Sequence, residues 1–333
     1  MASSRCRSYA WAKRVSQNGY PTKILYSRRD AFNDENAIRK IIFIIKLVFY
    51  SYFSNTMIFH KYIPPRTIQK IIFRSPIIFD FDDRIYTTKK LKNKKSRFTS
   101  FLHSANSIIV SSGFLKDEIL SCYGQLENKI TVIPTLVDLR AYQSACENKI
   151  TTGNKNKFRI GWIGTSSSFQ YLKKIEDSIC RLLKEFEHQV EFEIVSDRSF
   201  RFESDNCSVI NTKWDIDQEI KYFTRFDVTI MPLDDSNRAR GKAAFKAIQS
   251  LAANVPVIAS AVGFNVDIIK HGQNGFLAEN YDQFYHYLKK MILDRSILET
   301  LRRNARSSVQ HMDYSNWSTI YFDTILDHPK FKG

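Results

Sequence analysis

The sequence predicts an α/β protein with two domains, each built around a parallel β-sheet. Three observations lead to this prediction. Short apolar runs rich in β-branched residues alternate with helical patterns along most of the chain. Within residues 223–277 a strand, a polar loop, a helix and a second strand follow one another, which is one β-α-β unit. The chain has 333 residues, enough for two domains of about 150 residues each.

Composition excludes several classes of protein. Hydrophobic residues make up 43% of the chain, which supports full cores. The first 20 residues lack the apolar core of a signal peptide, and the apolar run 41–53 is interrupted by Lys46 and too short to span a bilayer. Five scattered cysteines without metal-ligand spacing suggest a reducing compartment, where they stay thiols. We therefore expect a cytoplasmic protein.

The net charge of +16 is concentrated in the N-terminal half. Residues 1–150 contain 25 Lys and Arg against 11 Asp and Glu, a balance of +14, whereas residues 151–333 contain 25 against 23. A basic half of this kind can bind nucleic acid, anionic lipid or an anionic substrate, or it can serve solubility alone. The run 89–97 holds six cations in nine residues. It is a solvated loop or docks on an anionic membrane surface; without interleaved aromatic residues, nucleic acid is not expected.

Apolar runs and helical patterns alternate in the N-terminal half. The helix 36–53 is apolar all round, which indicates either burial or contact with a membrane surface, and we expect burial. No strand precedes Ser3, although a domain of this kind normally opens with one. The predicted helices are 7–17, 36–53, 66–73, 98–105 and 113–123, and the predicted strands are 22–26, 57–60, 77–79, 107–111 and 129–133.

Three acidic residues follow the strand 77–79. Asp80, Asp82 and Asp83 lie within four positions, where their charges repel unless a cation, a ligand or a raised pKa offsets the repulsion. Several interpretations remain open. Asp80 and Asp82 fit a phosphotransferase with Asp80 as its nucleophile, or an Asp-x-Asp metal site. The acidic residues also suit the cap of a following helix.

The C-terminal half shows the clearer β-α-β repeat. A polar segment, 141–157, precedes it as a linker. The predicted strands are 158–163, 190–195, 227–233 and 255–259, and the predicted helices are 172–187, 218–223, 243–253, 281–294, 296–310 and 317–326.

Two loops of this half suit a phosphate group. Gly164 and Thr165 follow the strand 158–163, and the loop 234–242 carries Arg238 and Lys242 before a helix. Ligands of parallel sheets lie beyond the carboxyl ends of the strands. Glycine allows close approach, while cations and backbone amides bind a diphosphate. Lys242 is otherwise an ordinary lysine at the start of a helix.

The motifs of this half resemble glycosyltransferase family 4. They run from Gly241-Lys242 through Lys246-Ala-Ile-Gln249 and Pro256-Val-Ile-Ala-Ser260 to His271-Gly-Gln-Asn-Gly275-Phe-Leu. Two glutamates that many members carry on this helix are absent, and Gly241 and Gln249 occupy their positions. In the N-terminal half, the acidic cluster and the segment 134–138 also resemble a subgroup of the family, and Asp80, Asp82 and Asp83 then lie at the reaction cleft.

The resemblance implies the GT-B fold: two Rossmann-like domains facing a cleft, here an acceptor domain 1–145, a donor domain 146–310 and a helix 311–333 crossing back. Because the family's Ser-Ser-Arg-x-Arg loop follows its first strand, this chain looks as though it begins after that strand. It also implies transfer of a sugar from a nucleotide sugar, with retention, to a glycan or lipid-linked acceptor in cell-surface polysaccharide synthesis, with no cofactor and no metal. The protein is then cytoplasmic or peripheral at the inner membrane face.

Individual residues receive roles from this resemblance. Gln249 either bonds the ribose or is a buried amide bonded to backbone, and Trp214 either packs on the base or belongs to the core. The expected catalytic residues are Asp82, Asp80 and Asp83; the diphosphate-binding residues are Lys242, Arg238, Gly164, Thr165 and Gly241; the nucleotide-binding residues are Gln249 and Trp214; and the acceptor-binding residues are Arg5 and Arg7. An inactive or partner-dependent scaffold and an Asp-x-Asp phosphotransferase remain as alternatives.

Overall fold

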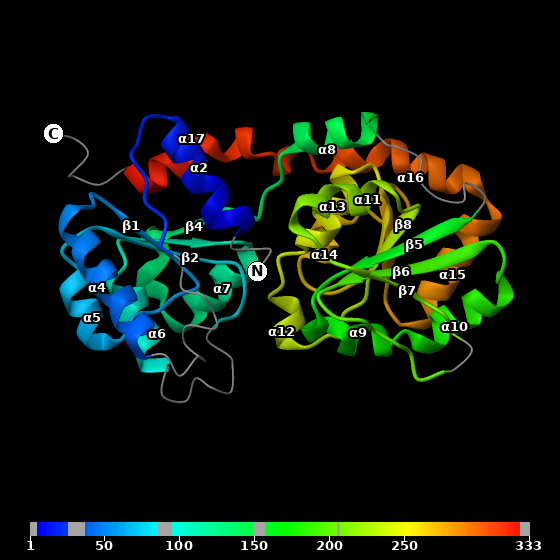
Figure 1. Ribbon diagram of the computed structural model, residues 1–333, viewed down its shortest axis with the longest axis horizontal. Coiled ribbons are helices and arrows are strands. Elements are labelled where there is room, and N and C mark those ends of the chain that lie inside the picture. The colour runs from blue at the N-terminus through cyan, green and yellow to red at the C-terminus, as the bar shows by residue number, and fades with distance from the viewer. Residues whose placement is uncertain (1–4, 26–36, 86–94, 149–156, 205–206, 327–333) are drawn as a thin grey trace. The chain divides into compact units, whose positions relative to one another are not determined.

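The chain divides into two compact units. The first comprises Met1–Thr135 and Trp317–Gly333, and the second comprises Leu136–Asn316. The computed structural model describes residues 5–25, 37–85, 95–148, 157–204 and 207–326 (Figure 1). Residues 89–94 of the basic run and 149–156 of the linker lie outside these residues. Each unit contains one parallel sheet, which confirms the predicted α/β class.

The sheet of the first unit has the strand order β1-β2-β3-β4. Its central strand β2 is buried along its whole length, because helices cover both faces of the sheet. The strands are β1 (Met57–His60), β2 (Ile77–Phe81), β3 (Ser107–Val110) and β4 (Ile130–Val132). In the register of β1 and β2, His60 lies beside Asp80.

Helices cover the two faces of this sheet in two groups (Figure 1). One face packs Phe79 and Phe81 against α4 to α7. On the other face, α2 and α17 are joined by stacking of Trp11 on Tyr321, with ring centroids 3.9 Å apart. The helices are α2 (Ala10–Gln17), preceded by the π-helical turn Arg5–Tyr9, α4 (Ala37–Phe53), α5 (Arg66–Ile72), α6 (Lys95–Ser104), α7 (Gly113–Cys122), the 3-10 helix Gly124–Lys129 and α17 (Tyr314–Leu326).

The sheet of the second unit has the order β10-β9-β8-β5-β6-β7. The chain therefore starts in the middle of the sheet, builds outward to β7, and then crosses back to β8, β9 and β10. The carboxyl ends of β5 and β8 are neighbours at this crossover point. The strands are β5 (Phe158–Ile163), β6 (Val190–Ser196), β7 (Ile210–Lys213), β8 (Val228–Met231), β9 (Val257–Ser260) and β10 (Gly275–Ala278).

Helices also flank the second sheet. Helices α10 and α15 pack on each other. Helix α13 packs on β8 and β9, and it also contacts α11 and α8. The elements are α8 (Leu139–Glu147), α9 (Phe169–Lys173), α10 (Glu176–Glu185), α11 (Glu219–Thr224), α12 (Asn237–Arg240), α13 (Phe245–Ala252), α14 (Asn265–Ile268), α15 (Asp282–Leu293) and α16 (Arg295–Ser308), with 3-10 turns at Ser166–Ser168, Ile216–Gln218 and Gln310–Met312.

Three sequence predictions of secondary structure are wrong. The expected strand 22–26 is irregular over its described residues 22–25, whose side chains are exposed or half-buried and find no sheet partner there. The expected helix 172–187 is broken into α9 and α10 around Lys174 and Ile175. The prediction also missed β10, which pairs with β9.

Helix α4 is not buried as expected. Leu47 and Ser51 face the first unit's interior, but Ile38 is 69% exposed and Phe53 is 72% exposed. The expectation failed because apolar residues occupy both the inward and the outward face of this helix, so its composition does not show which face packs. Within the described residues, no helix is both long and apolar enough to cross a membrane.

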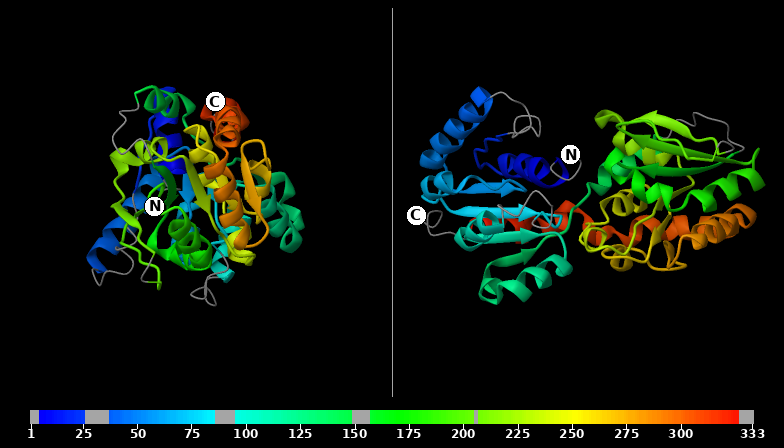
Figure 2. Two further views of the ribbon diagram at one scale, coloured as in Figure 1. Left: turned by 90° about the vertical axis from the view of Figure 1, so that its right-hand side faces the viewer. Right: turned by 90° about the horizontal axis from the view of Figure 1, so that it is seen from below.

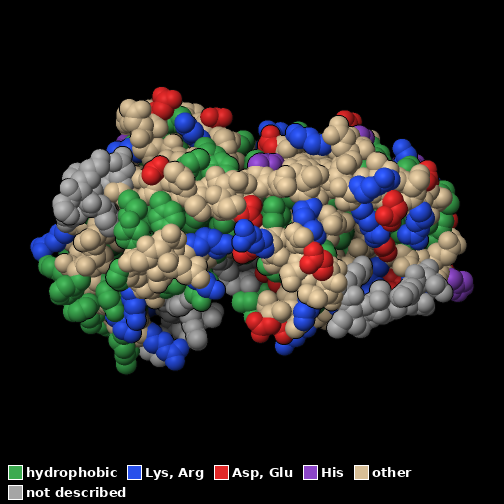
Figure 3. Space-filling view, turned by 90° about the horizontal axis from the view of Figure 1, so that it is seen from above, with side chains coloured by type: hydrophobic (Ala, Val, Ile, Leu, Met, Phe, Trp, Pro, Cys, Tyr) green, Lys and Arg blue, Asp and Glu red, His purple; other side chains and the backbone are tan. Residues whose placement is uncertain are grey.

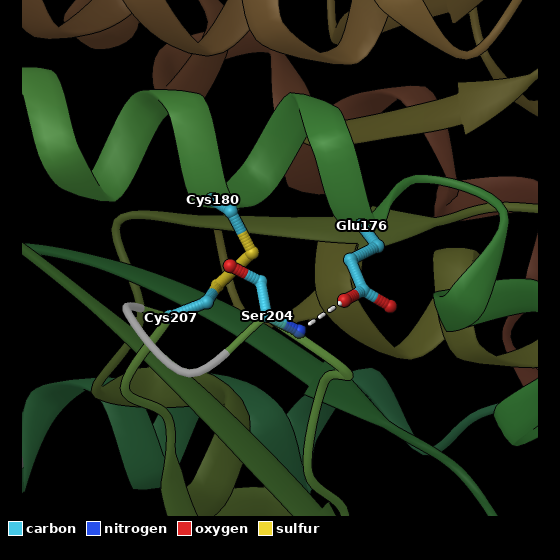
Figure 4. The surroundings of a disulfide bond; sticks show 4 residues. All are labelled: Glu176, Cys180, Ser204 and Cys207. Atoms are coloured by element: carbon cyan, nitrogen blue, oxygen red, sulfur yellow. Dashed lines mark hydrogen bonds between the residues drawn. A yellow bond between two sulfur atoms is a disulfide. The ribbon is translucent and has the colours of Figure 1, made fainter.

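One pair of cysteines is joined in the second unit. Cys180 on α10 and Cys207 form a disulfide, with Cα atoms 5.0 Å apart (Figure 4). Beside it, the amide of Ser204 donates to Glu176 Oε1 over 2.8 Å. The expectation that all five cysteines are thiols is therefore wrong for this pair. Spacing along the chain did not reveal it, because 27 positions separate the two residues.

Candidate active site

A buried cluster of charged residues lies at the carboxyl ends of β1 and β2 in the first unit. The parallel register places His60 beside Asp80, and Lys61 and Asp82 come directly after them. Asp80 and Asp82 are 5% and 3% exposed, whereas Asp83 is exposed. The structure thus brings together two of the three predicted acidic residues inside the unit and leaves the third at its surface.

Arg7 is the principal partner of Asp80. Arg7 Nη2 lies 2.6 Å from Asp80 Oδ1, and Arg7 Nη1 donates to the carbonyl of Ile133 over 2.7 Å. Burial by itself would raise the pKa of Asp80, but the charge of Arg7 and the hydrogen bond from His60 outweigh it and hold that pKa well below its usual range. Burial lowers the pKa of Arg7, whereas the charge of Asp80 raises it, and the pKa is raised overall. Asp80 is therefore a buried carboxylate.

His60, like Lys61, is a member of this cluster that the sequence did not predict. Its Nδ1 lies 2.8 Å from Asp80 Oδ2. Because Asp80 is ionised, it accepts this hydrogen bond, so Nδ1 carries the proton. Nε2 is buried, has no hydrogen-bond partner among the described residues, and lies 3.9 Å from Asp82 Oδ1. The position of His60 at the end of the apolar run 57–60 was the available signal.

Lys61 compensates the other two acidic residues. Its ammonium forms ion pairs with Asp82 and, over 2.5 Å, with Asp83. Burial lowers the pKa of Lys61, but the charges of the two carboxylates raise it by more than that, so the pKa is raised overall. Its backbone adopts a left-handed φ of 54°, which is uncommon for a residue with a side chain. The repulsion between the carboxylates is thus offset by Arg7 and Lys61.

In the second unit, loops at the carboxyl ends of β5 and β6 lie together. The amide of Gly164 donates to the carbonyl of Val195, and Ser166 donates from its amide to Asp197 over 2.6 Å. Gly164 is half-buried and Thr165 is exposed. A Cβ on Gly164 would overlap the ring of Trp162, so a side chain has no room there. Backbone therefore forms the surface at this point.

The loop that carries Lys242 reaches the same edge of the sheet. Lys242 Nζ lies 4.5 Å from the ring centroid of Tyr171, on α9, which follows the Gly164 loop. Burial and the charge of Asp234 raise the pKa of Tyr171, and the charge of Arg238 opposes them. The structure therefore brings Lys242, Arg238 and the Gly164 loop into one region of the second unit. Arg238 is exposed, and Gly241 is a buried residue that ends α12.

Gly263 fixes the position of this loop. It has a left-handed φ of 57°, and a Cβ there would lie 2.5 Å from the carbonyl oxygen of Arg240. The backbone after β9 is thus packed directly against the end of α12. Helix α13 then begins after Ala244, whose own φ is 46°. A tightly constrained backbone therefore flanks Lys242 on both sides.

The remaining expected residues lie elsewhere or are already engaged. The amide of Gln249 is buried, donates to Tyr142 Oη over 2.8 Å and accepts from Lys246 Nζ over 2.9 Å, so it matches the buried-amide interpretation, with side-chain partners instead of backbone. Trp214 is half-buried after β7, at the edge of the sheet, and so is not a core residue. The side chain of Arg5 lies outside the described part of the structure. No group of three His, Cys, Asp or Glu residues suited to a metal ion occurs among the described residues.

Comparison with known proteins gives a consistent result. Residues 200–308 match the family model for glycosyl transferases group 1. The chain is 23% identical, over 273 residues, to the capsular polysaccharide biosynthesis glycosyltransferase CapM of Staphylococcus aureus, covering 74% of this chain and 68% of CapM. The comparisons thus support the resemblance to glycosyltransferase family 4.

Solved structures agree on the fold of this chain. HepE of Anabaena, in a crystal structure with UDP-glucose, superposes with a TM-score of 0.64 at 14% identity, over 96% of this chain and 89% of HepE. TarM of S. aureus, in a mutant crystallised with UDP, fondaparinux and α-GlcNAc-glycerol, gives 0.61 at 13% identity, over 85% of this chain and 59% of TarM. The expected GT-B fold is thereby confirmed.

Proposed function

We propose that this glycosyltransferase moves a hexose from a nucleoside diphosphate sugar to a glycan or lipid-linked acceptor during assembly of a cell-surface polysaccharide. The observation that carries this proposal is the buried Arg7–Asp80–His60 chain, which ends in a histidine nitrogen without a partner among the described residues. An ion pair that only stabilises the fold has no need of this nitrogen. A substrate hydroxyl does need it, as an acceptor for its hydrogen bond or proton. The name of CapM supports the polysaccharide pathway.

His60 would act on a hydroxyl of the acceptor. Asp80 holds the ring and fixes its tautomer, so that Nε2 can accept a proton or a hydrogen bond from the hydroxyl. Asp82, 3.9 Å from Nε2, would contact the same sugar while it is paired with Lys61. In this scheme Asp80 is a positioning residue, Arg7 holds Asp80 and does not bind the acceptor, and Asp83 supports Lys61.

The second unit would bind the donor. As the sugar leaves, negative charge develops on the departing diphosphate, and catalysis depends on stabilising that charge. Lys242 and Arg238 supply positive charge, and the Gly164–Thr165 backbone permits close approach. Because these groups belong to the chain itself, we propose that transfer needs no divalent metal. We also propose retention of the anomeric configuration, which the family resemblance implies.

Two structural neighbours guide the choice of donor. HepE was crystallised with UDP-glucose, and TarM with UDP and sugar ligands. We therefore propose a uridine nucleotide sugar as the donor to test first, and a site of action on the cytoplasmic side of the membrane.

The test measures nucleotide binding and transfer separately. In the presence of a chelator, UDP, GDP and dTDP are added to the protein and its thermal midpoint is recorded. A ligand at about 100 times its Kd adds about 2.7 kcal/mol of stability, which is a shift of several degrees. We expect one nucleotide to give this shift and Lys242→Ala to lose it. Lys221→Ala, an exposed lysine on α11, is the matched control and should keep it.

Variants of the first unit separate the competing functions. His60→Ala should lower the rate of transfer by about 10²–10⁴-fold and leave the nucleotide shift unchanged, because it removes a proton acceptor but no donor contact. Nucleotide binding without turnover by the wild type for any sugar donor would indicate an inactive or partner-dependent scaffold. Phosphotransfer abolished by the chelator and by Asp80→Asn would indicate the Asp-x-Asp phosphotransferase instead.

A further inference from the structure

Helix α4 exposes a continuous apolar stripe. The exposed residues recur three or four positions apart and so lie on one face, covering about a third of the helix circumference. They include the large side chains Phe49, Tyr52 and Phe53 near the C-terminal end. The full set is Ile38, Ile41, Ile42, Ile45, Phe49, Tyr52 and Phe53, each of them 47% to 72% exposed. Exposed apolar side chains on a soluble protein are usually scattered, and a continuous patch indicates an interaction surface.

The opposite face of α4 anchors the helix in the first unit. Leu47 belongs to the core, and the carbonyl of Ser51 accepts a hydrogen bond from Ser75 Oγ over 2.7 Å. Phe43 packs edge-on against Tyr62. Helix α4 is thus fixed by its inner face, and the exposed stripe is a rigid surface feature. In Figure 2 the helix lies at the outer margin of the first unit.

From the start of α4 to Phe79, the charged side chains have a single sign. Residues 37–79 contain seven Lys and Arg and no Asp or Glu. Arg39 and Lys46 are exposed along one edge of the stripe, and Lys70 and Arg74 are exposed on and just after α5, which packs against α4. Arg74 lies over the ring of Tyr52, 4.8 Å from its centroid. Figure 3 shows hydrophobic and basic side chains gathered at the end of the first unit.

This combination selects an anionic bilayer over other occupants. A second copy of the chain, docked face to face, would bring the same cations together and repel. A bilayer instead accepts apolar side chains below its headgroups, aromatic rings at the interface and cations at anionic phosphates. We propose that α4 lies flat on an anionic membrane surface, with its stripe inserted among the headgroups. At 17 residues, about 25 Å, it is a surface element.

The test is binding to lipid vesicles, which does not depend on transferase activity. Wild type should float with vesicles of phosphatidylcholine and phosphatidylglycerol, bind pure phosphatidylcholine weakly, and be released by salt. Ile45→Ser/Phe49→Ser should reduce binding at least tenfold with little change of the thermal midpoint, because both side chains are more than half exposed. Leu293→Ser, a 67% exposed leucine in the second unit, is the matched control and should bind as wild type does.

A second pair of variants tests the charge. Arg39→Gln and Lys46→Gln should each weaken binding to the anionic vesicles by about fivefold. Failure of wild type to bind anionic vesicles would overturn the proposal, as would equal binding by the Ile45→Ser/Phe49→Ser variant. A wild-type dimer in sedimentation that this variant dissociates, without vesicle binding, would assign the stripe to a second copy of the chain.

Discussion

Asp80 shows how single residues determine the properties of the first unit. A carboxylate buried this deeply stays charged only because Arg7 and His60 both bind it. The sequence analysis found the acidic cluster because three acidic residues in four positions are unusual. It did not find His60 or Lys61, because they become partners of the cluster only through the pairing of β1 with β2, which local sequence does not specify.

Replacement of Asp80 tests this ion pair. Asp80→Asn leaves Arg7 buried without its counter-charge and should lower the free energy of unfolding at pH 7 by about 3 kcal/mol. The folded pKa of Asp80 lies below its unfolded value, so its contribution is complete above the unfolded pKa and is lost as the pH falls through the folded one. Urea unfolding should therefore show the difference between wild type and variant narrowing below about pH 4.

A double variant controls for simple loss of packing. Arg7→Met in the Asp80→Asn background removes the uncompensated charge and should restore part of the lost stability. If the difference between wild type and Asp80→Asn were the same at pH 7 and at pH 3, the ionised pair would not be its cause.

At the scale of elements, short apolar runs predicted strands well, and β1 and β5 have the predicted bounds. The prediction was less successful where long-range packing decides whether a segment forms a strand or which face of a helix is buried. The segment 22–25 has the composition of a strand but no sheet neighbour in the described structure, and α4 is apolar on both faces. The motif at Gly275 has a structural explanation, because a Cβ there would overlap the Val257 carbonyl of the neighbouring strand β9.

The disulfide between Cys180 and Cys207 joins α10 to the segment before β7. Closing a loop of this length stabilises a protein by about 3–4 kcal/mol in the chain-entropy model. The thermal midpoint of the oxidised protein should therefore fall by several degrees when a reductant is added. Differential scanning calorimetry measures this change.

Thiol counting supplies the control for this prediction. The Cys180→Ser/Cys207→Ser variant should have the same midpoint with and without reductant, whereas Cys122→Ser, which changes an exposed cysteine, should respond as wild type does. Five reactive thiols in the unfolded, oxidised wild type would show that the bond does not form.

At the scale of the whole molecule, the two units carry different chemistry on related sheets. The first unit contains a buried cluster of charged residues and the basic, apolar face of α4, while the second contains the glycine and cation loops. Donor binding is predicted for the second unit mainly from the C-terminal motifs, which include parts of the β-α-β scaffold as well as the loops. The Arg7–Asp80–His60 chain could not be predicted, because it depends on contacts between residues 73 positions apart.

The division of roles predicts where a nucleotide changes hydrogen exchange. The nucleotide that shifts the thermal midpoint should slow amide exchange at residues 164–172 and 234–250, because bound ligand suppresses local opening of the loops that contact it. Residues 57–61 and 77–83 should exchange at the same rate with and without it. Mass spectrometry of peptic fragments measures both regions in one experiment, and Lys242→Ala should lose the protection. Protection of 57–61 by the nucleotide alone would mean that His60 belongs to the donor site, and the assignment of this residue to the acceptor hydroxyl would then be wrong.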